Sequence, residues 1–275
     1  MKLNHTNSDP VVEWQNRNLP KLKSLSFDKP YHNNVTLITN WLWADDRFDL
    51  LLDSLLSAIL MAWKNCGRLP VTLIVNRITI PLRTMAETWG IRLLLKPNIK
   101  GGGGNARELN RDSILNAQHY FDTEYMLTFQ NHAFPIRPGL LEFLGKWDYI
   151  AAPWLFEKDD WITRLLLPRR LHVGNGAFTI RSRKLCEVTA FYFRKYQYLP
   201  HCYLFNDDYF IGKTLPSWEK DYQKTIRIAS PEIAATFSLE DNIELHQQIK
   251  ARPFGFHGPV AFQCLIDEGQ IHDIC

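Results

Sequence analysis

The sequence lacks the features that would place a protein outside the cell or across a membrane. Its five cysteines are an odd number at irregular spacing, without a Cys-x-x-Cys pair. Neither a disulfide framework nor a zinc motif is therefore indicated. The beginning of the chain, MKLNHTNSDPVVEW, contains no apolar stretch like that of a secretory signal. No window approaches the roughly 18 apolar residues of a membrane span, so we expect a cytoplasmic protein.

A strong charge of one sign is also lacking. The formal net charge is only +3, and Lys and Arg are dispersed along the chain. A surface that follows nucleic-acid phosphates needs these residues clustered on one face, so no nucleic-acid partner is expected. Hydrophobic residues make up 45% and charged residues 22%, which is ordinary for a globular domain. Anionic small molecules remain compatible with this composition.

The first half of the chain alternates strand and helix patterns. Short β-branched runs predict strands at 35–39, 71–75, 91–95 and 125–129, and helical periodicity predicts helices at 46–63, 81–90 and 105–121. This alternation predicts an α/β fold with a mainly parallel sheet and right-handed crossovers. Ligands of such sheets bind beyond the carboxyl ends of the strands.

The second half has a different pattern, with short strands near 148–152 and 175–181 and helices at about 182–196 and 207–214. We interpret the chain as a single composite domain over residues 33–265, since it shows no repeat and no clear linker. It divides into a first half at about 33–135 and a second half at about 136–265. The polar, proline-punctuated residues 1–32 predict an extension lying on the surface, and residues 266–275 a C-terminal tail.

Four pieces of the second half carry a resemblance to a known family: WDYIAAPW (147–154), VGNGAFTIRSRKL (173–185), NDDYF (206–210) and PFGFHG (253–258). In this order and spacing, they resemble GT-A glycosyltransferases, most closely a poorly characterised branch that reads DYIGAPW, GNGGFSLRSRK, N-x-EDxxF and PFGFHG. The resemblance covers roughly residues 35–260. It implies a GT-A-like, Rossmann-like mixed sheet flanked by helices, with a nucleotide-binding half at about 33–135 and an acceptor half at about 136–265. It also implies inverting transfer of a hexosyl or deoxyhexosyl group from a nucleotide sugar to a glycan or lipid-linked acceptor.

The fourth strand carries a departure from that family. Its members have a Q-x-D-G-F-type motif there, whose acid helps to hold a divalent metal under the nucleotide diphosphate. This chain reads Gln130, Asn131, His132, so a histidine stands where the acid is expected. Mg²⁺ and Mn²⁺ prefer carboxylate oxygen, whereas imidazole suits softer metals. We expect Gln130, Asn131 and His132 to contact the donor, since a His or Asn can donate hydrogen bonds to a diphosphate. A Mg²⁺ or Mn²⁺ cofactor and a metal-independent site both stay open. The alternative interpretation is that Asn131 and His132 only cap a strand and face water.

His257, in the last motif, matches a histidine that often completes the metal or diphosphate site of GT-A enzymes. Gly255 and Gly258 on either side would let the backbone approach a ligand closely. A structural histidine held among aromatic residues is the alternative.

The resemblance assigns Asp208 as the general base that deprotonates the acceptor hydroxyl, and Asp207 as the residue that orients the acceptor or the base. The alternative is local, because Asn206 and Asp207 also suit the N-cap of a helix, where acids favour the helix dipole.

The glycine-rich stretch KGGGGNARELN (100–110) matches the dinucleotide fingerprint G-x-G-x-x-A. Residues 96–100 separate the glycines from the strand, however, so a nicotinamide or flavin dehydrogenase is disfavoured. In the GT-A interpretation, Arg107 and Asn110 contact the donor diphosphate at a helix N-terminus; a solvent-exposed helix face is the alternative. Four residues that follow strands one and two are expected near the base and ribose: Thr39, Asn40, Asn76 and Arg77.

Acceptor contacts are expected at Gly174, Asn175 and Gly176, which form a turn that substrate could approach, and at Trp154, which could stack on a sugar or pack in the core. The segment 155–172 mixes apolar residues with arginines. It is open to interpretation as a lid over the donor, as a basic surface for a lipid-linked acceptor at the inner face of a membrane, or as an ordinary loop. A non-catalytic sugar- or nucleotide-binding scaffold of the same fold is the alternative function.

Overall fold

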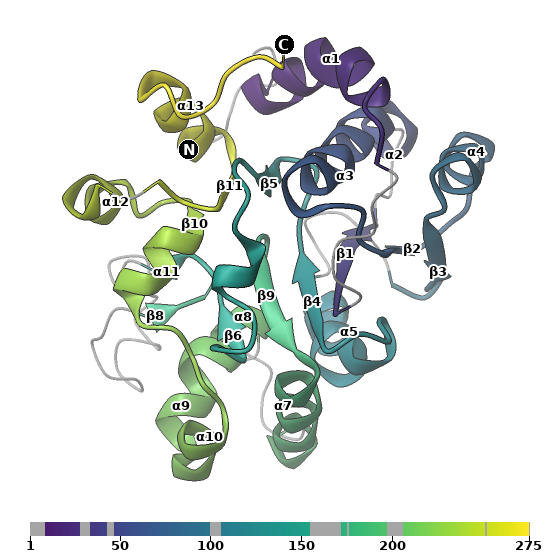
Figure 1. Ribbon diagram of the computed structural model, residues 1–275. Coiled ribbons are helices and arrows are strands. Elements are labelled where there is room, and N and C mark those ends of the chain that lie inside the picture. Colours follow the sequence, from purple (N-terminus) through teal and green to yellow (C-terminus); the bar gives the residue numbers. More distant parts are fainter. Residues whose placement is uncertain are drawn as a thin grey trace.

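The sheet expected from the alternating pattern lies at the centre of the molecule (Figure 1). The computed structural model describes residues 9–27, 34–42, 47–99, 106–154, 172–174, 176–196, 206–250 and 252–274. Six strands form the main sheet in the order β3 (Arg92–Leu95), β2 (Val71–Val75), β1 (Val35–Trp41), β4 (Tyr125–Thr128), β9 (Thr179–Ser182) and β6 (Tyr149–Ile150). The first four strands in this order are parallel, and β9 is antiparallel to both neighbours. The mixed, mainly parallel sheet of a GT-A-like fold is therefore confirmed.

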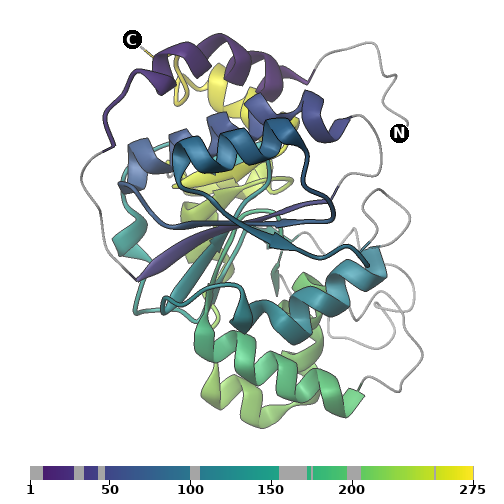
Figure 2. The same cartoon turned by 90° about the vertical axis from the view of Figure 1, so that its right-hand side faces the viewer.

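Helices cover both faces of this sheet (Figure 2). The helices α2 (Arg47–Leu50), α3 (Leu52–Cys66) and α4 (Ile80–Trp89) follow β1 and β2, whereas α5 (Ala106–Asn116) and α7 (Arg183–Tyr196) pack together on the opposite face. Local signals set the helix ends. Thr79 accepts a hydrogen bond from the Leu82 backbone N–H at the start of α4, and Gly90, with φ 66°, ends it. The helix expected over 46–63 is divided at Leu51.

The expectation that residues 1–32 form a surface extension is wrong for the helix α1 (Pro10–Lys23). Its residues Val11, Trp14, Leu19 and Leu22 are buried, and it packs on α3. These apolar residues recur at helical spacing, but the stripe also contains polar Gln15 and Asn18, which conceal the pattern in the sequence. A helix whose contact face is partly polar needs hydrogen-bond partners that only the folded chain supplies.

The C-terminal tail belongs to the same layer as α1. Ile271 and Ile274 are buried, and Asp273 accepts hydrogen bonds from Arg17 and Asn18 of α1. Figure 1 shows this end of the chain beside α1. Both terminal segments are therefore part of the packed body instead of lying free on it.

Two smaller sheets complete the second half. The strands β10 (Ser238–Leu239), β11 (Gly255–His257) and β5 (Ala133–Pro135) form one, and β7 (Pro153–Trp154) with β8 (His172–Val173) forms the other. The remaining helical elements are η1 (Ala117–His119), η2 (Leu140–Glu142), α8 (Asp207–Tyr209), the π-helix η5 (Phe210–Thr214), α9 (Leu215–Trp218), α10 (Lys220–Thr225), α11 (Pro231–Phe237), α12 (Ile243–Ile249) and α13 (Pro259–Asp267).

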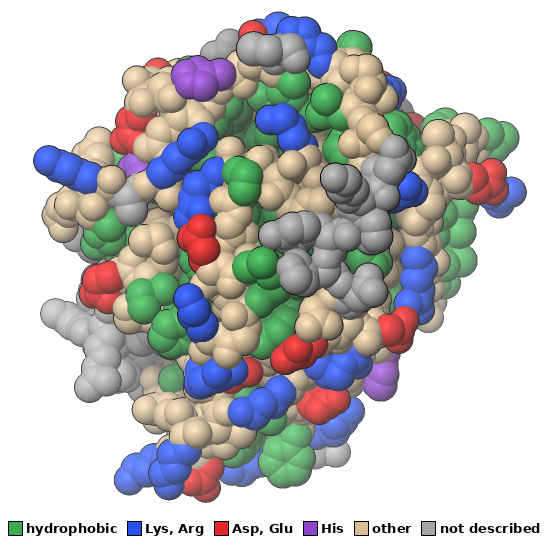
Figure 3. All heavy atoms as spheres, viewed as in Figure 1, with side chains coloured by type: hydrophobic (Ala, Val, Ile, Leu, Met, Phe, Trp, Pro, Cys, Tyr) green, Lys and Arg blue, Asp and Glu red, His purple; other side chains and the backbone are tan. Residues whose placement is uncertain are grey.

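The surface agrees with the low net charge. Basic and acidic side chains are interspersed over the face shown in Figure 3 instead of gathering in one patch. Within the described ranges, no helix has both the length and the apolar character needed to cross a membrane.

Candidate functional site

Several expected site residues leave the sheet at one edge. In the parallel part, Ile38 pairs with Thr128, and Trp41 with Val75, so the carboxyl ends of β1, β2 and β4 lie together. Thr128 also pairs with Thr179 at the beginning of the antiparallel strand β9. Residues 130–132, which follow β4, and Gly176, which precedes β9, are therefore at the same edge. This is the edge where α/β folds bind ligands.

The first cluster at this edge is a pair of histidines. The Nε2 atoms of His132 and His257 are 3.0 Å apart, and their ring centroids are 4.8 Å apart. The antiparallel pairing of β5 with β11 causes this contact, because it places His257 opposite Ala133. The Gly258 N–H also donates to the His132 carbonyl oxygen. The two histidines expected to share a site are thus in direct contact.

Two neighbours set the hydrogen bonding of these two residues, which we call the histidine pair. Glu240 Oε1 lies 2.8 Å from Nδ1 of His257, and Gln130 Oε1 lies 3.3 Å from its Nε2. An ionised carboxylate only accepts, so Nδ1 of His257 carries a proton. Burial, and next the charge of His257, lower the pKa of His132 to about 4. His132 is therefore neutral at neutral pH.

Buried polar contacts hold the 130–132 segment from behind. The Gln15 side chain of α1 donates to the Asn131 carbonyl oxygen and accepts from Ser54, and Ser54 accepts from the Asn131 amide. Asn131 is buried. Its side chain therefore supports the loop and does not face the edge, which corrects the expectation that it contacts a donor. The helix α1 is part of the support of the site.

The histidine pair fits Mg²⁺ poorly. The described side chains in hydrogen-bonding contact with the pair offer an amide oxygen from Gln130 and a single carboxylate, Glu240, which is already held by His257 Nδ1. Mg²⁺ binds oxygen in octahedral geometry and is usually held by carboxylates. We therefore assign no catalytic step to a magnesium ion.

The second cluster consists of two adjacent carboxylates at the start of α8. Asp207 accepts hydrogen bonds from Arg181 Nη2 at 2.8 Å and from Ser113 Oγ at 2.9 Å. Asp208 accepts from the backbone N–H groups of Tyr209 at 2.7 Å and Gly176 at 3.3 Å. Each acid also accepts from the backbone N–H of the residue that follows it, whereas Asn206, at the N-cap position of α8, makes no side-chain capping hydrogen bond. Asp207 orients its neighbour directly, because its Oδ1 accepts from the Asp208 N–H.

The two carboxylates differ in electrostatics. Burial and the adjacent charge of Asp207 raise the pKa of Asp208 to about 7, although its two backbone hydrogen bonds and Arg181 act in the opposite direction. Arg181 is buried, with 2% of its side chain exposed, and its contact with Asp207 is an ion pair. Asp207 is thus compensated by a cation, whereas Asp208 is the carboxyl that can gain and lose a proton near neutral pH.

The expected donor contacts are distributed unevenly. Asn40, Asn76 and Arg77 are partly exposed at the common edge, and the Arg77 guanidinium lies 4.5 Å from the Phe48 ring centroid. Thr39 is buried, with 1% exposed, so its expected contact with a donor is not supported. Arg107 is exposed at the start of α5. Asn110, one turn further on, donates to Asn206 beside the carboxylates.

The expected acceptor residues have packing roles in this structure. Trp154 is partly exposed and lies 4.7 Å from the Tyr209 ring, and a Cβ on Gly174 would come within 2.7 Å of the Trp154 indole. Gly176 holds Asp208 through its backbone N–H. Asn175 and residues 155–171 of the expected lid lie outside the described residues, and the side chain of His172 is not described.

The expectation that the glycines around His257 let a ligand approach needs a correction for Gly255. A Cβ on Gly255 would come within 2.5 Å of the Phe178 ring, so this glycine makes room for an aromatic side chain and not for a ligand. Gly258 has φ 87°, a conformation that other residues rarely adopt, and nothing lies within 4 Å of the position of a Cβ there.

Sequence reasoning missed three residues that support the site: Arg181, Glu240 and Gln15. Arg181 had a detectable signal, because it lies in the expected strand 175–181 directly after a mostly apolar run that ends at Ile180. A buried arginine usually has an acidic partner. Glu240 and Gln15 had no such signal, since their partners are 17 and 116 residues away in the chain.

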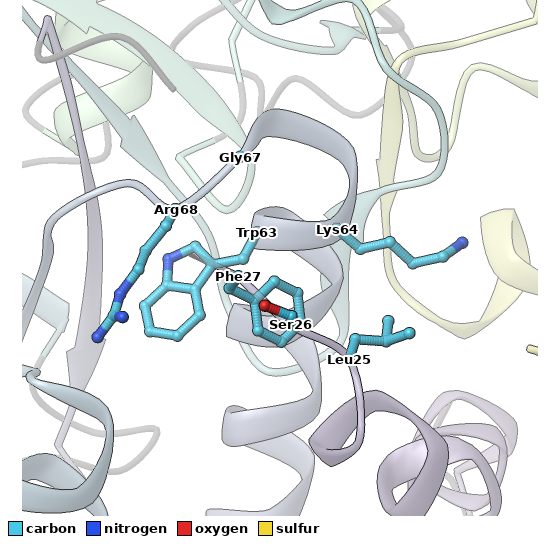
Figure 4. Close-up of a pocket in the computed structure, with 7 residues that line it drawn as sticks. All are labelled: Leu25, Ser26, Phe27, Trp63, Lys64, Gly67 and Arg68. Carbon is cyan, nitrogen blue, oxygen red and sulfur yellow. The ribbon is translucent and has the colours of Figure 1, made fainter. Parts of the chain in front are cut away.

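A separate cavity, of about 470 Å³, lies at the end of α3 (Figure 4), where the Arg68 guanidinium lies over the Trp63 ring. Gly67 and Arg68 precede β2, so this cavity is near the opposite edge of the sheet from the two clusters. It is not part of the candidate site.

Comparison with known proteins supports the fold. No curated protein matches the chain in sequence. A crystal structure of an active-site mutant of LgtC is similar with a TM-score of 0.50 and 12% identity, over 81% of this chain and 86% of that chain. At this identity, the similarity shows a shared fold. A family model described as "Protein of unknown function (DUF5672)" matches residues 113–257, which include both clusters. The chain therefore belongs to this family.

Proposed function

We propose that the protein is a glycosyltransferase that moves a hexosyl or deoxyhexosyl group from a nucleotide-sugar donor to a glycan or lipid-linked acceptor, with inversion. The observation that carries this proposal is Asp208, a carboxyl whose pKa is raised to about 7 at the carboxyl edge of a GT-A-like sheet. A base with a pKa near the working pH combines a large ionised fraction with a strong tendency to accept a proton. The fold shared with LgtC, a protein with an active site, supports the proposal that this chain is an enzyme.

In the proposed reaction, Asp208 takes the proton of the acceptor hydroxyl, and the oxygen of that hydroxyl attacks the anomeric carbon of the donor sugar. The bond from that carbon to the donor diphosphate breaks, and its electron pair goes to the leaving phosphate oxygen. Asp207 holds Asp208 in place through the Asp208 backbone N–H, and Arg181 neutralises Asp207. The acceptor would approach past Gly174, Gly176 and Trp154, and Asn175 is proposed to contact it.

The histidine pair would stabilise the leaving diphosphate. The two Nε2 atoms are 3.0 Å apart, so a proton on one of them is donated to the other. An imidazolium at His257 would donate to Glu240 through Nδ1 and to a phosphate oxygen through Nε2, which is a charge-assisted contact. We propose that this contact, together with Arg107 at the start of α5, replaces the metal of related enzymes. Asn40, Asn76 and Arg77 would contact the nucleoside.

The decisive experiment incubates the purified chain with a panel of nucleotide sugars and measures release of the nucleoside diphosphate. We expect Asp208→Asn to reduce turnover at least about a hundredfold while nucleotide binding is retained. Asp122→Asn is the matched control, because the Asp122 side chain is 96% exposed, and it should leave turnover unchanged. Unchanged turnover in Asp208→Asn would remove the assignment of the base.

A chelator titration tests the metal separately. Full activity in excess EDTA is expected if the histidine pair binds the diphosphate directly. If EDTA abolishes activity and added Mn²⁺ or Mg²⁺ restores it, the transfer requires a divalent metal.

The alternative is a non-catalytic scaffold of the same fold, and the histidine in place of the family's acid favours it. Thermal or chemical unfolding with nucleoside diphosphates separates the two functions. A ligand at about a hundredfold its Kd adds roughly 2.7 kcal/mol of stability. Nucleotide binding without turnover of any donor would favour the scaffold.

The location is part of the same proposal. We infer a cytoplasmic enzyme whose residues 155–172 contact the inner face of a membrane when the acceptor is lipid-linked. Co-sedimentation with anionic vesicles, compared between the intact chain and a variant with Arg169 and Arg170 changed to Gln, tests this contact.

A further inference from the structure

A second group of metal-ligating side chains lies apart from the histidine pair, between α12 and α13. It consists of His246 on α12, Cys264 on α13 and Glu268 directly after α13, and their ligand atoms all lie within 4.8 Å of one another. His246 Nε2 is 2.8 Å from Glu268 Oε2, and Cys264 Sγ is 3.6 Å from Glu268 Oε1. Cys264 and Glu268 are four residues apart along a helix, so both face His246. We call this group the His-Cys-Glu cluster.

The three ligand types point to one class of metal. A thiolate, an imidazole and a carboxylate together are ligands that Zn²⁺ prefers, whereas Mg²⁺ and Ca²⁺ require mostly oxygen. Zinc bonds of about 2.0–2.3 Å in tetrahedral geometry place neighbouring ligand atoms roughly 3.3–3.8 Å apart. The separations are 2.8 Å and 3.6 Å, and all three ligand atoms lie within 4.8 Å of one another. Side-chain rotations that move His246 and Glu268 slightly apart would bring them to the zinc geometry. From this cluster we propose a zinc site formed by His246, Cys264 and Glu268.

The surroundings of the cluster allow a metal to enter. His246 is only 3% exposed, and it lines a cavity of about 290 Å³ together with Gln247, Lys250, Glu268 and Gln270. The cavity would admit water as a fourth ligand. Lys250 is exposed, so its charge can turn toward solvent.

The protonation state of the ligands also permits binding. His246 Nδ1 is buried and has no hydrogen-bond partner within the described ranges. In the metal-free structure, His246 Nε2 lies 2.8 Å from the Glu268 carboxylate and therefore carries the ring proton. Zinc binding would move this proton to Nδ1 or release it, which leaves the Nε2 lone pair for the metal. Burial and the charge of Glu268 raise the pKa of the Cys264 thiol, so Cys264 is protonated in the metal-free chain and would release its proton when zinc binds.

A metal at this position would have a structural consequence for the candidate site. The helices α12 and α13 flank the strand β11 in the chain, and β11 carries His257 (Figure 1). Glu240, the partner of His257, precedes α12. Zinc would connect α12 to the end of α13. It would thereby restrain the segment between Glu240 and α13, which includes His257.

Metal binding by the full chain tests this site without any donor or acceptor. The metal-free protein is titrated with Zn²⁺, and with Co²⁺ as a spectroscopic probe whose thiolate ligand gives a charge-transfer absorption. We expect one metal ion per chain, a thiolate band, and an unfolding temperature that falls when a chelator is added. Cys264→Ser should remove the band, and His246→Gln should weaken zinc binding at least about tenfold.

Two controls keep the outcome decisive. Cys264 is partly exposed, so Cys264→Ser is expected to fold, and circular dichroism checks this. The double variant His132→Gln with His257→Gln removes the histidine pair and should retain both the band and the bound ion. The proposal is overturned if the wild-type chain binds no stoichiometric zinc, if Cys264→Ser binds it equally well, or if only the histidine-pair variant loses it. None of these readouts depends on glycosyl transfer.

Discussion

The histidine pair and the carboxylate pair lie at the same edge of the sheet and experience the same physical effect with opposite results. Burial disfavours the charged form of each group, so it lowers the pKa of His132 to about 4 and raises the pKa of Asp208 to about 7. At neutral pH, the histidine is neutral and the acid is close to half ionised. The comparison shows that one edge supplies both a neutral hydrogen-bonding group and a group that can accept a proton.

The neighbours of the two pairs also differ. Asp207 has a buried cation, Arg181, as its partner, whereas His257 has an acid, Glu240. In each pair, one member has a charged partner: Asp207 contacts Arg181, and His257 contacts Glu240. Burial disfavours the charged form of the other member, which is Asp208 or His132. The predictions below remove these partners in turn.

The largest effect on stability is expected from Arg181→Met. The substitution removes a buried cation and leaves Asp207 without compensation, which should lower the free energy of unfolding by about 3–5 kcal/mol. Urea denaturation measures this change. Arg194→Met, at an exposed position of the neighbouring helix α7, should change stability by less than about 0.5 kcal/mol. Similar values for the two variants would contradict the role given to the ion pair.

The next effect concerns the pH dependence of stability at the histidine pair. Between pH 6.5 and about 4, the unfolded chain binds a proton at residue 132 that the folded chain does not, because the folded pKa is lowered. The stability of the wild type should therefore fall relative to His132→Gln as the pH decreases through this window, by at most about 1.4 kcal/mol per pH unit. Chemical denaturation of both proteins across this range measures the difference. A constant difference from pH 8 to 4 would show that His132 titrates normally in the folded state.

The smallest effect is a shift in titration at the carboxylate pair. Asp207→Asn removes the like charge that raises the pKa of Asp208 and keeps an oxygen for Arg181 and Ser113 to contact. The pKa of Asp208 should fall, so Asp208 stays ionised at lower pH and the acid limb of the transfer rate moves down by about one pH unit. Carboxyl carbon NMR of Asp208 reports the same shift without an assay. A rise in the pKa of Asp208 would contradict this prediction. It would mean that Arg181 has moved away and no longer lowers that pKa.

Much of the first half could be predicted from local patterns. The four parallel strands and the helices that follow them were identified because β-branched runs and helical periodicity are properties of neighbouring residues. The same reasoning failed for α1, whose contact face includes Gln15 and Asn18. These residues are buried only because Asn131, Ser54, Trp14 and the C-terminal tail provide hydrogen-bond partners.

The candidate site divides in the same way. The motifs identified His132, His257, Asp207 and Asp208, and the structure places the histidines in contact and the acids side by side. Asn131, in the fourth-strand motif, and Thr39, by its position at the end of the first strand, were expected to contact the donor, and the structure buries both. Whether a side chain at a strand end faces the ligand edge or the interior depends on the pleat and on the helix behind it, which single motifs do not encode.

The sequence by itself determined the alternation of strands and helices, the edge at which polar residues gather, and the residue types available there. Only the tertiary structure decided which of them meet and which charges they carry. The contact between His132 and His257 spans 125 residues, and the pKa values of His132 and Asp208 depend on burial by distant segments. Ionisation depends on solvent exclusion and on neighbours in space, and these exist only once the chain has folded.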